Sequence, residues 1–147
     1  MIYTPATKKA MKLMFEAHKE QVDKSGLPYV FHPFHVAEQM QDETATVVAL
    51  LHDLVEDTDY TLADLRDMGF SEAVCGAIGL MTHEESVPYM EYVRQIKTNP
   101  IAVQVKLADL RHNSDMSRLD SVTERDIARA QQYKEAIRLL SENEDEE

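Results

Sequence analysis

The chain has 147 residues and carries 27 acidic against 15 basic side chains, which gives a formal net charge of −12 at pH 7. A chain of this length fits one domain that can bury roughly two-thirds of its unfolded surface. The acidic balance argues against nonspecific nucleic-acid binding and against anionic membranes, since both need a basic surface. A single cysteine, Cys75, excludes an intramolecular disulfide framework. With no signal-peptide pattern and no apolar run of about 20 residues, we expect a cytoplasmic protein.

Capping signals divide the chain into helices. Thr4-Pro5 and Asn99-Pro100 each place a capping residue before a proline, a pattern typical of a helix N-terminus. Thr61 and Ser71 cap two further helices, and Ser121 with Glu124 predicts a capping box. The expected helices cover residues 5–23, 34–41, 43 to 55 or 57, 62–69, 72–81, 88–98, 100–113 and 124–140. We therefore expect an all-α fold, one compact helical bundle over residues 1–141, with an acidic, disordered tail over residues 142–147.

The segment LHDLVEDT, residues 51–58, concentrates charge on an otherwise apolar helix. It places His52, Asp53, Glu56 and Asp57 within six residues. Residues four apart on a helix are neighbours, so these carboxylates would repel one another unless a cation neutralised them. Metal coordination is one of the few remedies for charge crowded in this way. The segment therefore predicts a metal site.

Two distant residues complete the candidate ligand set. His32 stands immediately before Pro33, and we expect it on a loop because the residue before a proline prefers extended conformations. Asp109 interrupts an apolar helix, where an unpaired aspartate would be costly. Imidazole and carboxylate ligands together suit Mn²⁺, Fe²⁺, Zn²⁺ or a similar ion. They do not indicate a structural zinc site of the thiolate type. The candidate ligands are His32, His52, Asp53 and Asp109.

The order of these ligands, a His, then a His-Asp pair, then a distant Asp, resembles the HD superfamily of metal-dependent phosphohydrolases. Within it, SGLPYVFHP, HVAEQM, ALLHDLVEDT and VKLADLRHN are similar to the (p)ppGpp hydrolase domain of RelA/SpoT-type proteins and their small stand-alone relatives. The similarity runs from about residue 17 to residue 113. It implies an all-α HD fold with one divalent metal, usually Mn²⁺. It also implies hydrolysis of the 3′-pyrophosphate ester of a guanosine alarmone to a nucleotide and pyrophosphate.

The resemblance also implies a role for individual residues. Glu56 and Asp57 correspond to the pair that orients and deprotonates the attacking water. Substrate contacts to the phosphates or the nucleoside are expected from Lys24, Lys106 and Asn113. The metal ligands are those already named.

Some positions depart from the pattern of alarmone hydrolases. Asp23 stands where they have an arginine that packs on guanine, and Met116 where they have a threonine that helps to hold the nucleoside. In the segment 109–113, DLRHN, Arg and Leu are exchanged. Two other interpretations therefore stay open: an HD nucleotidase or phosphatase acting on a simpler phosphomonoester, and a catalytically silent module that binds a metal and a nucleotide. His83 has no expected role, and that of His112 is undecided.

Overall fold

The computed structural model describes residues 1–142. They form the helices α1 (Pro5–His18), α2 (Phe31–Glu38), α3 (Glu43–Leu51), α4 (Leu54–Asp57), α5 (Leu62–Asp67), α6 (Glu72–Met81), α7 (Tyr89–Ile96), α8 (Pro100–Ser114) and α9 (Glu124–Ser141). Between residues 1 and 142 the only β pairing is an isolated bridge between Val22 and Pro28, and no helix there has the length and hydropathy needed to cross a membrane. The all-α prediction is confirmed.

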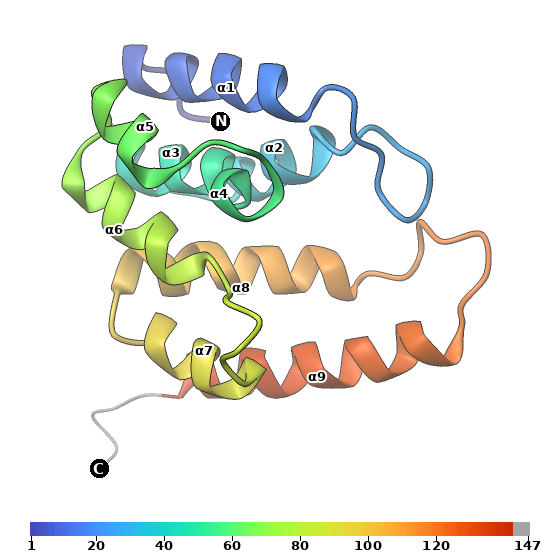
Figure 1. The fold of residues 1–147 in the computed structure, drawn as a ribbon. Coiled ribbons are helices and arrows are strands. Elements are labelled where there is room, and N and C mark those ends of the chain that lie inside the picture. Colours follow the sequence, from blue (N-terminus) through green and yellow to red (C-terminus); the bar gives the residue numbers. More distant parts are fainter. Residues whose placement is uncertain (143–147) are drawn as a thin grey trace.

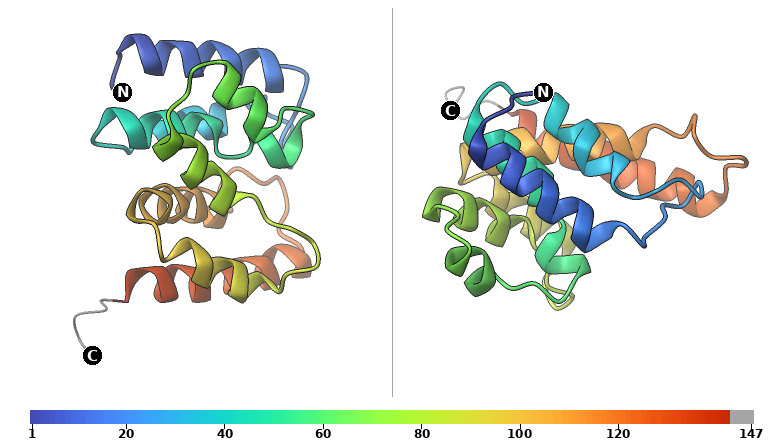
Figure 2. Two further views of the ribbon diagram at one scale, coloured as in Figure 1. Left: turned by 60° about the vertical axis from the view of Figure 1, so that its left-hand side comes forward. Right: turned by 90° about the horizontal axis from the view of Figure 1, so that it is seen from above.

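Helix α3 is the centre of the bundle. It packs against α1, α2, α6 and α8, while α8 in turn packs against α9 (Figures 1 and 2). Every residue of α3 from Ala45 to Leu51 is buried. Its nearly continuous apolar sequence predicts this burial, because a helix that is apolar on all sides must be covered on all sides. The helix delivers the segment 51–58 to the middle of the molecule.

Local capping accounts for most helix starts. The Asn99 side chain accepts hydrogen bonds from Ile101 N and Ala102 N, and Thr61 forms the predicted capping box with Asp64. The capping box predicted from Ser121 and Glu124 is wrong. Helix α9 begins instead with a reciprocal pair: Thr123 Oγ1 accepts from Asp126 N, and the Asp126 carboxylate accepts from Thr123 N.

The first helix ends at His18, five residues before the expected end at residue 23. Asp23 organises the loop that follows, because its Oδ1 accepts hydrogen bonds from Ser25 N, Ser25 Oγ and Leu27 N. Aspartate side chains that bond nearby backbone groups compete with helix formation in this way. Gly26, at φ +79°, supplies the left-handed residue of the turn.

The helix expected over residues 43–57 is broken at the histidine–aspartate pair. His52 and Asp53 lie between α3 and α4, and Asp53 has φ −101° and ψ 1°, a sparsely populated region common at active sites. The loop predicted for His32 is also wrong, since His32 is the second residue of α2. Pro33 is tolerated there because the first turn of a helix does not need its N–H groups.

The acidic tail predicted over residues 142–147 lies outside the described residues apart from Glu142. The backbone N–H of Glu142 donates to Leu139 O at the end of α9, and its carboxylate lies 3.7 Å from Lys97 Nζ.

Candidate metal centre

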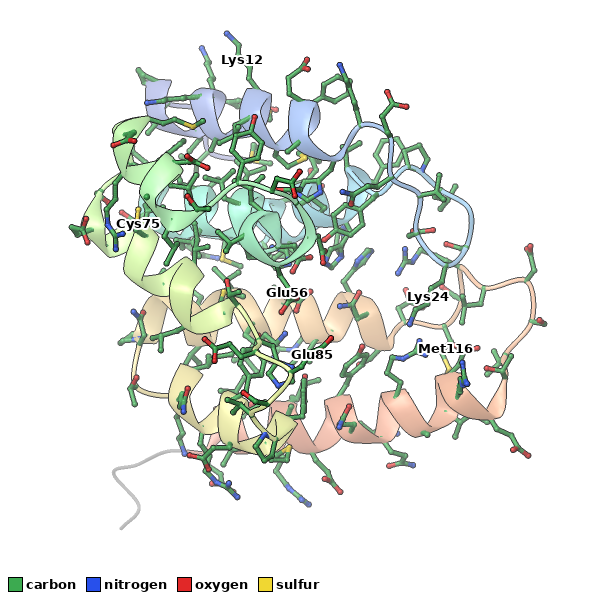
Figure 3. All side chains as sticks on the ribbon, viewed as in Figure 1. Lys12, Lys24, Glu56, Cys75, Glu85 and Met116 are labelled. Carbon is green, nitrogen blue, oxygen red and sulfur yellow. The ribbon has the colours of Figure 1, made fainter. Side chains whose placement is uncertain are left out.

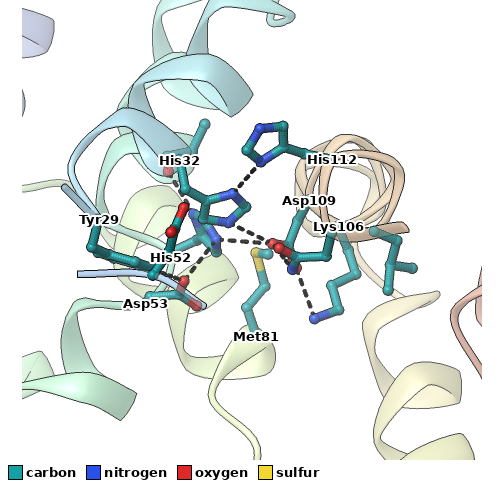
Figure 4. Close-up of polar contacts among 12 residues, drawn as sticks. Tyr29, His32, His52, Asp53, Met81, Lys106, Asp109 and His112 are labelled. Carbon is teal, nitrogen blue, oxygen red and sulfur yellow. Dashed lines mark hydrogen bonds and ion pairs between the residues drawn. The ribbon is translucent and has the colours of Figure 1, made fainter. Parts of the chain in front are cut away.

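Three buried side chains from separate parts of the chain meet at the centre of the bundle (Figure 4). His32 comes from α2, His52 from the break between α3 and α4, and Asp109 from α8. One ligand atom of each lies within 4.8 Å of the others. The three residues are only 5%, 1% and 3% exposed, respectively. Two imidazoles and a carboxylate at this spacing can hold a metal ion.

Asp53 lies at the edge of this cluster. Its Oδ2 is 3.2 Å from His52 Nε2, and it accepts a hydrogen bond from the hydroxyl of Tyr29. Asp53 is not one of the three mutually close ligands, although it contacts one of them. The structure therefore clusters three of the four predicted ligands and places Asp53 beside them, between His52 and Tyr29.

The hydrogen bonds of His52 test whether the site fits a cation. Its Nδ1 lies 2.6 Å from Ala49 O, and because a carbonyl can only accept, Nδ1 carries the proton. Nε2 of the neutral ring then presents a lone pair. It is buried without a hydrogen-bond partner, although carboxylate oxygens of Asp53 and Asp109 lie 3.2 Å and 3.4 Å away. A lone pair that faces two carboxylates is satisfied by a cation between them, so these residues fit a divalent metal.

The electrostatics of the centre favour positive charge. Burial lowers the pKa of His52, but Asp53 and Asp109 raise it more, so the pKa lies well above its ordinary value. Burial likewise raises the pKa of Asp109, but Lys106 and the two imidazoles hold it well below the ordinary range. These charges favour a cation at the cluster, which is either a proton on His52 or a metal ion among the four side chains.

Residues around the ligands hold them in place. Lys106 Nζ lies 3.0 Å from Asp109 Oδ2, and Asn113 Nδ2 donates to Asp109 Oδ1 at 3.0 Å. The sequence predicts substrate contacts for both. In the structure both side chains bond to the Asp109 carboxylate and orient it. Asn113 also lines the cavity described below.

His112 performs the same task for His32. Nδ1 of His32 lies 2.7 Å from Nδ1 of His112, and the two rings stack with centroids 4.9 Å apart. Burial, with the neighbouring His32, Arg118 and His35, lowers the pKa of His112 to about 4. A neutral His112 can accept the Nδ1 proton of His32, which leaves Nε2 of His32 free for a metal.

The acidic pair after the ligands divides into one tethered and one free carboxylate. Glu56 Oε1 accepts a hydrogen bond of 2.7 Å from the backbone N–H of His83. The Asp57 carboxylate makes no hydrogen bond or ion pair with a described side chain. It lines the cavity next to the cluster. Burial, then the charges of Asp53 and Glu56, raise the pKa of Asp57 to about 6.

A cavity of about 400 Å³ opens beside the cluster. Tyr29, Asp57 and Asn113 line its inner end, and the loop after α1 and the start of α9 form its walls. Lys24, from the loop after α1, and Met116, from the segment after α8, also line the cavity; both are labelled in Figure 3. Its remaining cationic residues are Arg118 and Arg129, each paired with an aspartate. The cavity therefore adjoins the cluster through Tyr29 and Asn113, which bond to Asp53 and Asp109.

Sequence reasoning missed three contributors: Tyr29, His83 and Arg118. Tyr29 belongs to the SGLPYVFHP segment, so its place before His32 was the one available signal. His83 acts through its backbone N–H, which no side-chain pattern reveals. Arg118 pairs with Asp23 across 95 residues of chain, and nothing local to either residue indicates the contact.

No family model matches the chain, but curated proteins do. It is 38% identical over 114 residues to the mouse guanosine-3′,5′-bis(diphosphate) 3′-pyrophosphohydrolase MESH1, a match covering 67% of this chain and 63% of the relative. The enzyme of the same name from Aquifex aeolicus is 30% identical over 113 residues, 69% of this chain and 16% of that protein. A Myxococcus xanthus GTP pyrophosphokinase is 34% identical over 142 residues, 85% of this chain and 18% of that one.

The chain is a homologue of the MESH1 and SpoT-like proteins. It spans only 13–18% of the length of the long bacterial relatives, and about three-fifths of the MESH1 proteins. A solved structure described as a metazoan ortholog of SpoT that hydrolyzes ppGpp superposes with a TM-score of 0.75, at 24% identity over 95% of this chain and 87% of that one. This chain and that solved structure therefore share one all-α fold.

Proposed function

We propose that this chain is a metal-dependent phosphohydrolase that removes pyrophosphate from the 3′ position of a guanosine alarmone such as ppGpp, in the cytoplasm. One observation carries the proposal: the lone pair of buried His52 Nε2 faces the carboxylates of Asp53 and Asp109. Tyr29 and Asn113, which bond to these two carboxylates, line the adjoining cavity of about 400 Å³. The homology to proteins named 3′-pyrophosphohydrolases supports the choice of substrate.

One divalent cation would be held by His32, His52, Asp53 and Asp109, and Mn²⁺ is the ion we expect, with Fe²⁺ and Zn²⁺ as the alternatives. When bound, such a cation polarises a phosphoryl oxygen and makes water more acidic. Tyr29, His112 and Lys106 keep the ligands in their orientations through the contacts described above.

Asp57 is the residue that accepts the proton of the attacking water in this proposal. Its carboxylate is free, it faces the cavity, and its pKa of about 6 suits a base that works near neutral pH. Glu56, fixed by the His83 N–H, orients the water. As water adds to the phosphorus, the bond from phosphorus to the ribose 3′ oxygen breaks. The 3′ oxygen takes up the proton that Asp57 accepted from the water, so that GDP and pyrophosphate are released.

Substrate contacts follow from the cavity. Lys24 is exposed at its outer end and makes no ion pair with a described residue, so its ammonium is free to bind a phosphate. Asn113 reaches both Asp109 and the cavity, so it can bind the nucleoside while it orients the ligand. Lys106 contributes positive charge from behind Asp109.

The test is hydrolysis of a panel of ppGpp, GTP, GMP and AMP by purified protein with Mn²⁺, with products separated by ion exchange and metal content determined on the same sample. We expect equal amounts of GDP and pyrophosphate from ppGpp. Asp53→Ala should abolish turnover while the thermal unfolding of the apoprotein stays cooperative. Asp59→Asn is the matched control, because Asp59 is an exposed acid two residues after Asp57. No turnover of any nucleotide by metal-loaded protein would refute the proposal.

A simpler phosphomonoesterase is the second candidate. It is favoured by Asp23, whose carboxylate is fully engaged by Ser25, Leu27 and Arg118 at the position where related hydrolases have an arginine for guanine. The same panel separates the two activities. Release of orthophosphate from GMP or AMP, with ppGpp unchanged, would identify the phosphomonoesterase.

A further inference from the structure

The ring of Tyr92, on α7, contacts two side chains that lead to different parts of the proposed active site. The Tyr92 ring stacks on His83, with centroids 4.5 Å apart and 26° between the planes. Lys106 Nζ lies over the same ring, 5.3 Å from its centroid. Tyr92 is 4% exposed, and its hydroxyl donates to Met81 O at 2.5 Å. The ring is therefore held by its hydroxyl and by its contacts with His83 and Lys106.

The contact with Lys106 leads to the metal ligands. Lys106 has a flexible side chain, yet that side chain is only 13% exposed, and its ammonium lies 3.0 Å from Asp109 Oδ2. The other oxygen of Asp109 faces His32 and His52 (Figure 4). A cation over an aromatic face is attracted to it. Tyr92 therefore restrains the ammonium that orients the Asp109 carboxylate.

The contact with His83 leads to Glu56. The backbone N–H of His83 donates to Glu56 Oε1 at 2.7 Å. His83 Nε2 bonds to Val87 O, also at 2.7 Å, which closes the loop between α6 and α7. Met81, whose carbonyl accepts from Tyr92, ends α6 just before this loop. Tyr92 therefore holds the loop on both sides of the N–H group that fixes Glu56.

We propose that Tyr92 is a positioning residue, which fixes Asp109 through Lys106 and Glu56 through His83. It thereby fixes the position of Asp109, on α8, relative to that of Glu56, on α4. The half that concerns Glu56 rests on the proposed hydrolase activity, whereas the half that concerns Asp109 does not. A buried aromatic that only fills the core would change stability and leave metal affinity alone.

The experiment compares Tyr92→Leu, Tyr92→Phe and Val93→Ala by Mn²⁺ titration against a fluorescent chelator, with thermal unfolding of each apoprotein. Val93 is the matched control, because it is fully buried on the same helix. Outer residues of a metal site typically change affinity by about 10–100-fold. We expect Tyr92→Leu to weaken Mn²⁺ binding at least about tenfold, and Tyr92→Phe, which keeps the ring, to bind within about threefold of the native protein. Val93→Ala should lose stability and keep native affinity.

The second readout separates the two contacts. His83→Ala keeps the backbone N–H but removes the ring from Tyr92 and the bond to Val87. We expect a fall in kcat of about tenfold with native Mn²⁺ affinity and little change in KM. If the native protein binds Mn²⁺ and hydrolyses nothing, the proposed function fails, and the Mn²⁺ titration still decides the role of Tyr92.

Native Mn²⁺ affinity in Tyr92→Leu, with a stability loss like that of Val93→Ala, would overturn the inference. If Tyr92→Leu does not fold, phenylalanines with one, two and three ring fluorines at position 92 replace it. Each fluorine weakens the attraction of the ring for Lys106 with almost no change in shape. Mn²⁺ affinity should fall along the series, and a constant affinity would overturn the inference equally.

Discussion

Arg118 Nη1 lies 3.0 Å from Asp23 Oδ2, so that an ion pair joins the loop after α1 to the segment between α8 and α9. Both residues line the cavity beside the metal centre. The resemblance to alarmone hydrolases predicts an arginine at the position of Asp23. In this chain the guanidinium at that side of the cavity comes from Arg118, in another part of the chain.

The Asp23–Arg118 pair should contribute measurably to stability. Burial alone would raise the pKa of Asp23, but Ser25, Leu27 and Arg118 lower it overall. A lowered acid pKa stabilises the fold above the unfolded pKa, and this stabilisation is lost as pH falls through the folded pKa. In urea unfolding at pH 7, a cycle of Asp23→Asn and Arg118→Gln should give a coupling of about 0.5–1 kcal/mol, since the pair is partly exposed. Zero coupling at low salt would contradict the expectation.

Arg118→Ala should also weaken substrate binding. The side chain is 30% exposed at the cavity wall and does not touch the metal ligands. We expect KM for ppGpp to rise about tenfold with kcat within about threefold, the pattern of lost uniform binding. Arg129→Ala, at the same cavity, serves as the comparison. Equal kcat losses in both variants would indicate a general disturbance of the cavity instead.

Asp109 and Lys106 depend on each other for charge compensation. Asp109→Asn leaves the Lys106 ammonium buried beside an uncharged amide, and breaking a buried pair in this way costs about 3–5 kcal/mol. We expect urea unfolding of the apoprotein to show such a loss. The double variant Asp109→Asn/Lys106→Met should recover part of it, because no charge then remains without a partner. An equally unstable double variant would show that the loss has another origin.

Asp57 should control the acid side of the pH profile. A carboxylate with a pKa of about 6 is protonated below that pH and cannot accept a proton. kcat should therefore rise about tenfold per pH unit below pH 6 and level off above it, and a bound cation would move the midpoint lower. Asp57→Asn should remove this limb and nearly all activity.

The same raised pKa has a cost in stability. An acid whose folded pKa is raised destabilises the fold as pH rises from the unfolded value through about 6. Asp57→Asn should therefore stabilise the apoprotein at pH 7, by about 1 kcal/mol or less after allowance for solvent exposure. A loss of stability in thermal unfolding at pH 7 would be the contrary result.

His112 should influence metal affinity although it is not a ligand. His112→Phe keeps a stacked ring and removes the acceptor for His32 Nδ1. We expect Mn²⁺ affinity to fall about 10–100-fold, measured by competition with a chelator. His35→Phe changes the neighbouring ring, whose centroid is 4.4 Å from that of His112, and should have little effect. Similar losses in both variants would point to ring packing rather than to the hydrogen bond.

Much of the fold follows from local sequence. Asn99-Pro100, the Thr61–Asp64 box and Ser71 each start a helix where predicted, because a cap and the N–H groups that it satisfies lie within three residues. The apolar sequence of α3 likewise predicts its central place. The ligand set is predicted from the order of residues that His32, His52, Asp53 and Asp109 share with a known family. In the structure His32, His52 and Asp109 form one cluster, and Asp53 contacts His52 at its edge.

The tertiary structure alone decided how that set is completed. Local preference predicts a helix over residues 43–57, yet the helix is interrupted at His52 and Asp53. The side chains of these two residues contact each other, and His52 also contacts Asp109. The contacts that tune the site, such as Arg118 with Asp23 and the His83 N–H with Glu56, join segments 95 and 27 residues apart. Such pairs depend on how helices pack, and no short-range spacing encodes them. The residues of the proposed chemistry were thus determined by sequence, and their partners by packing.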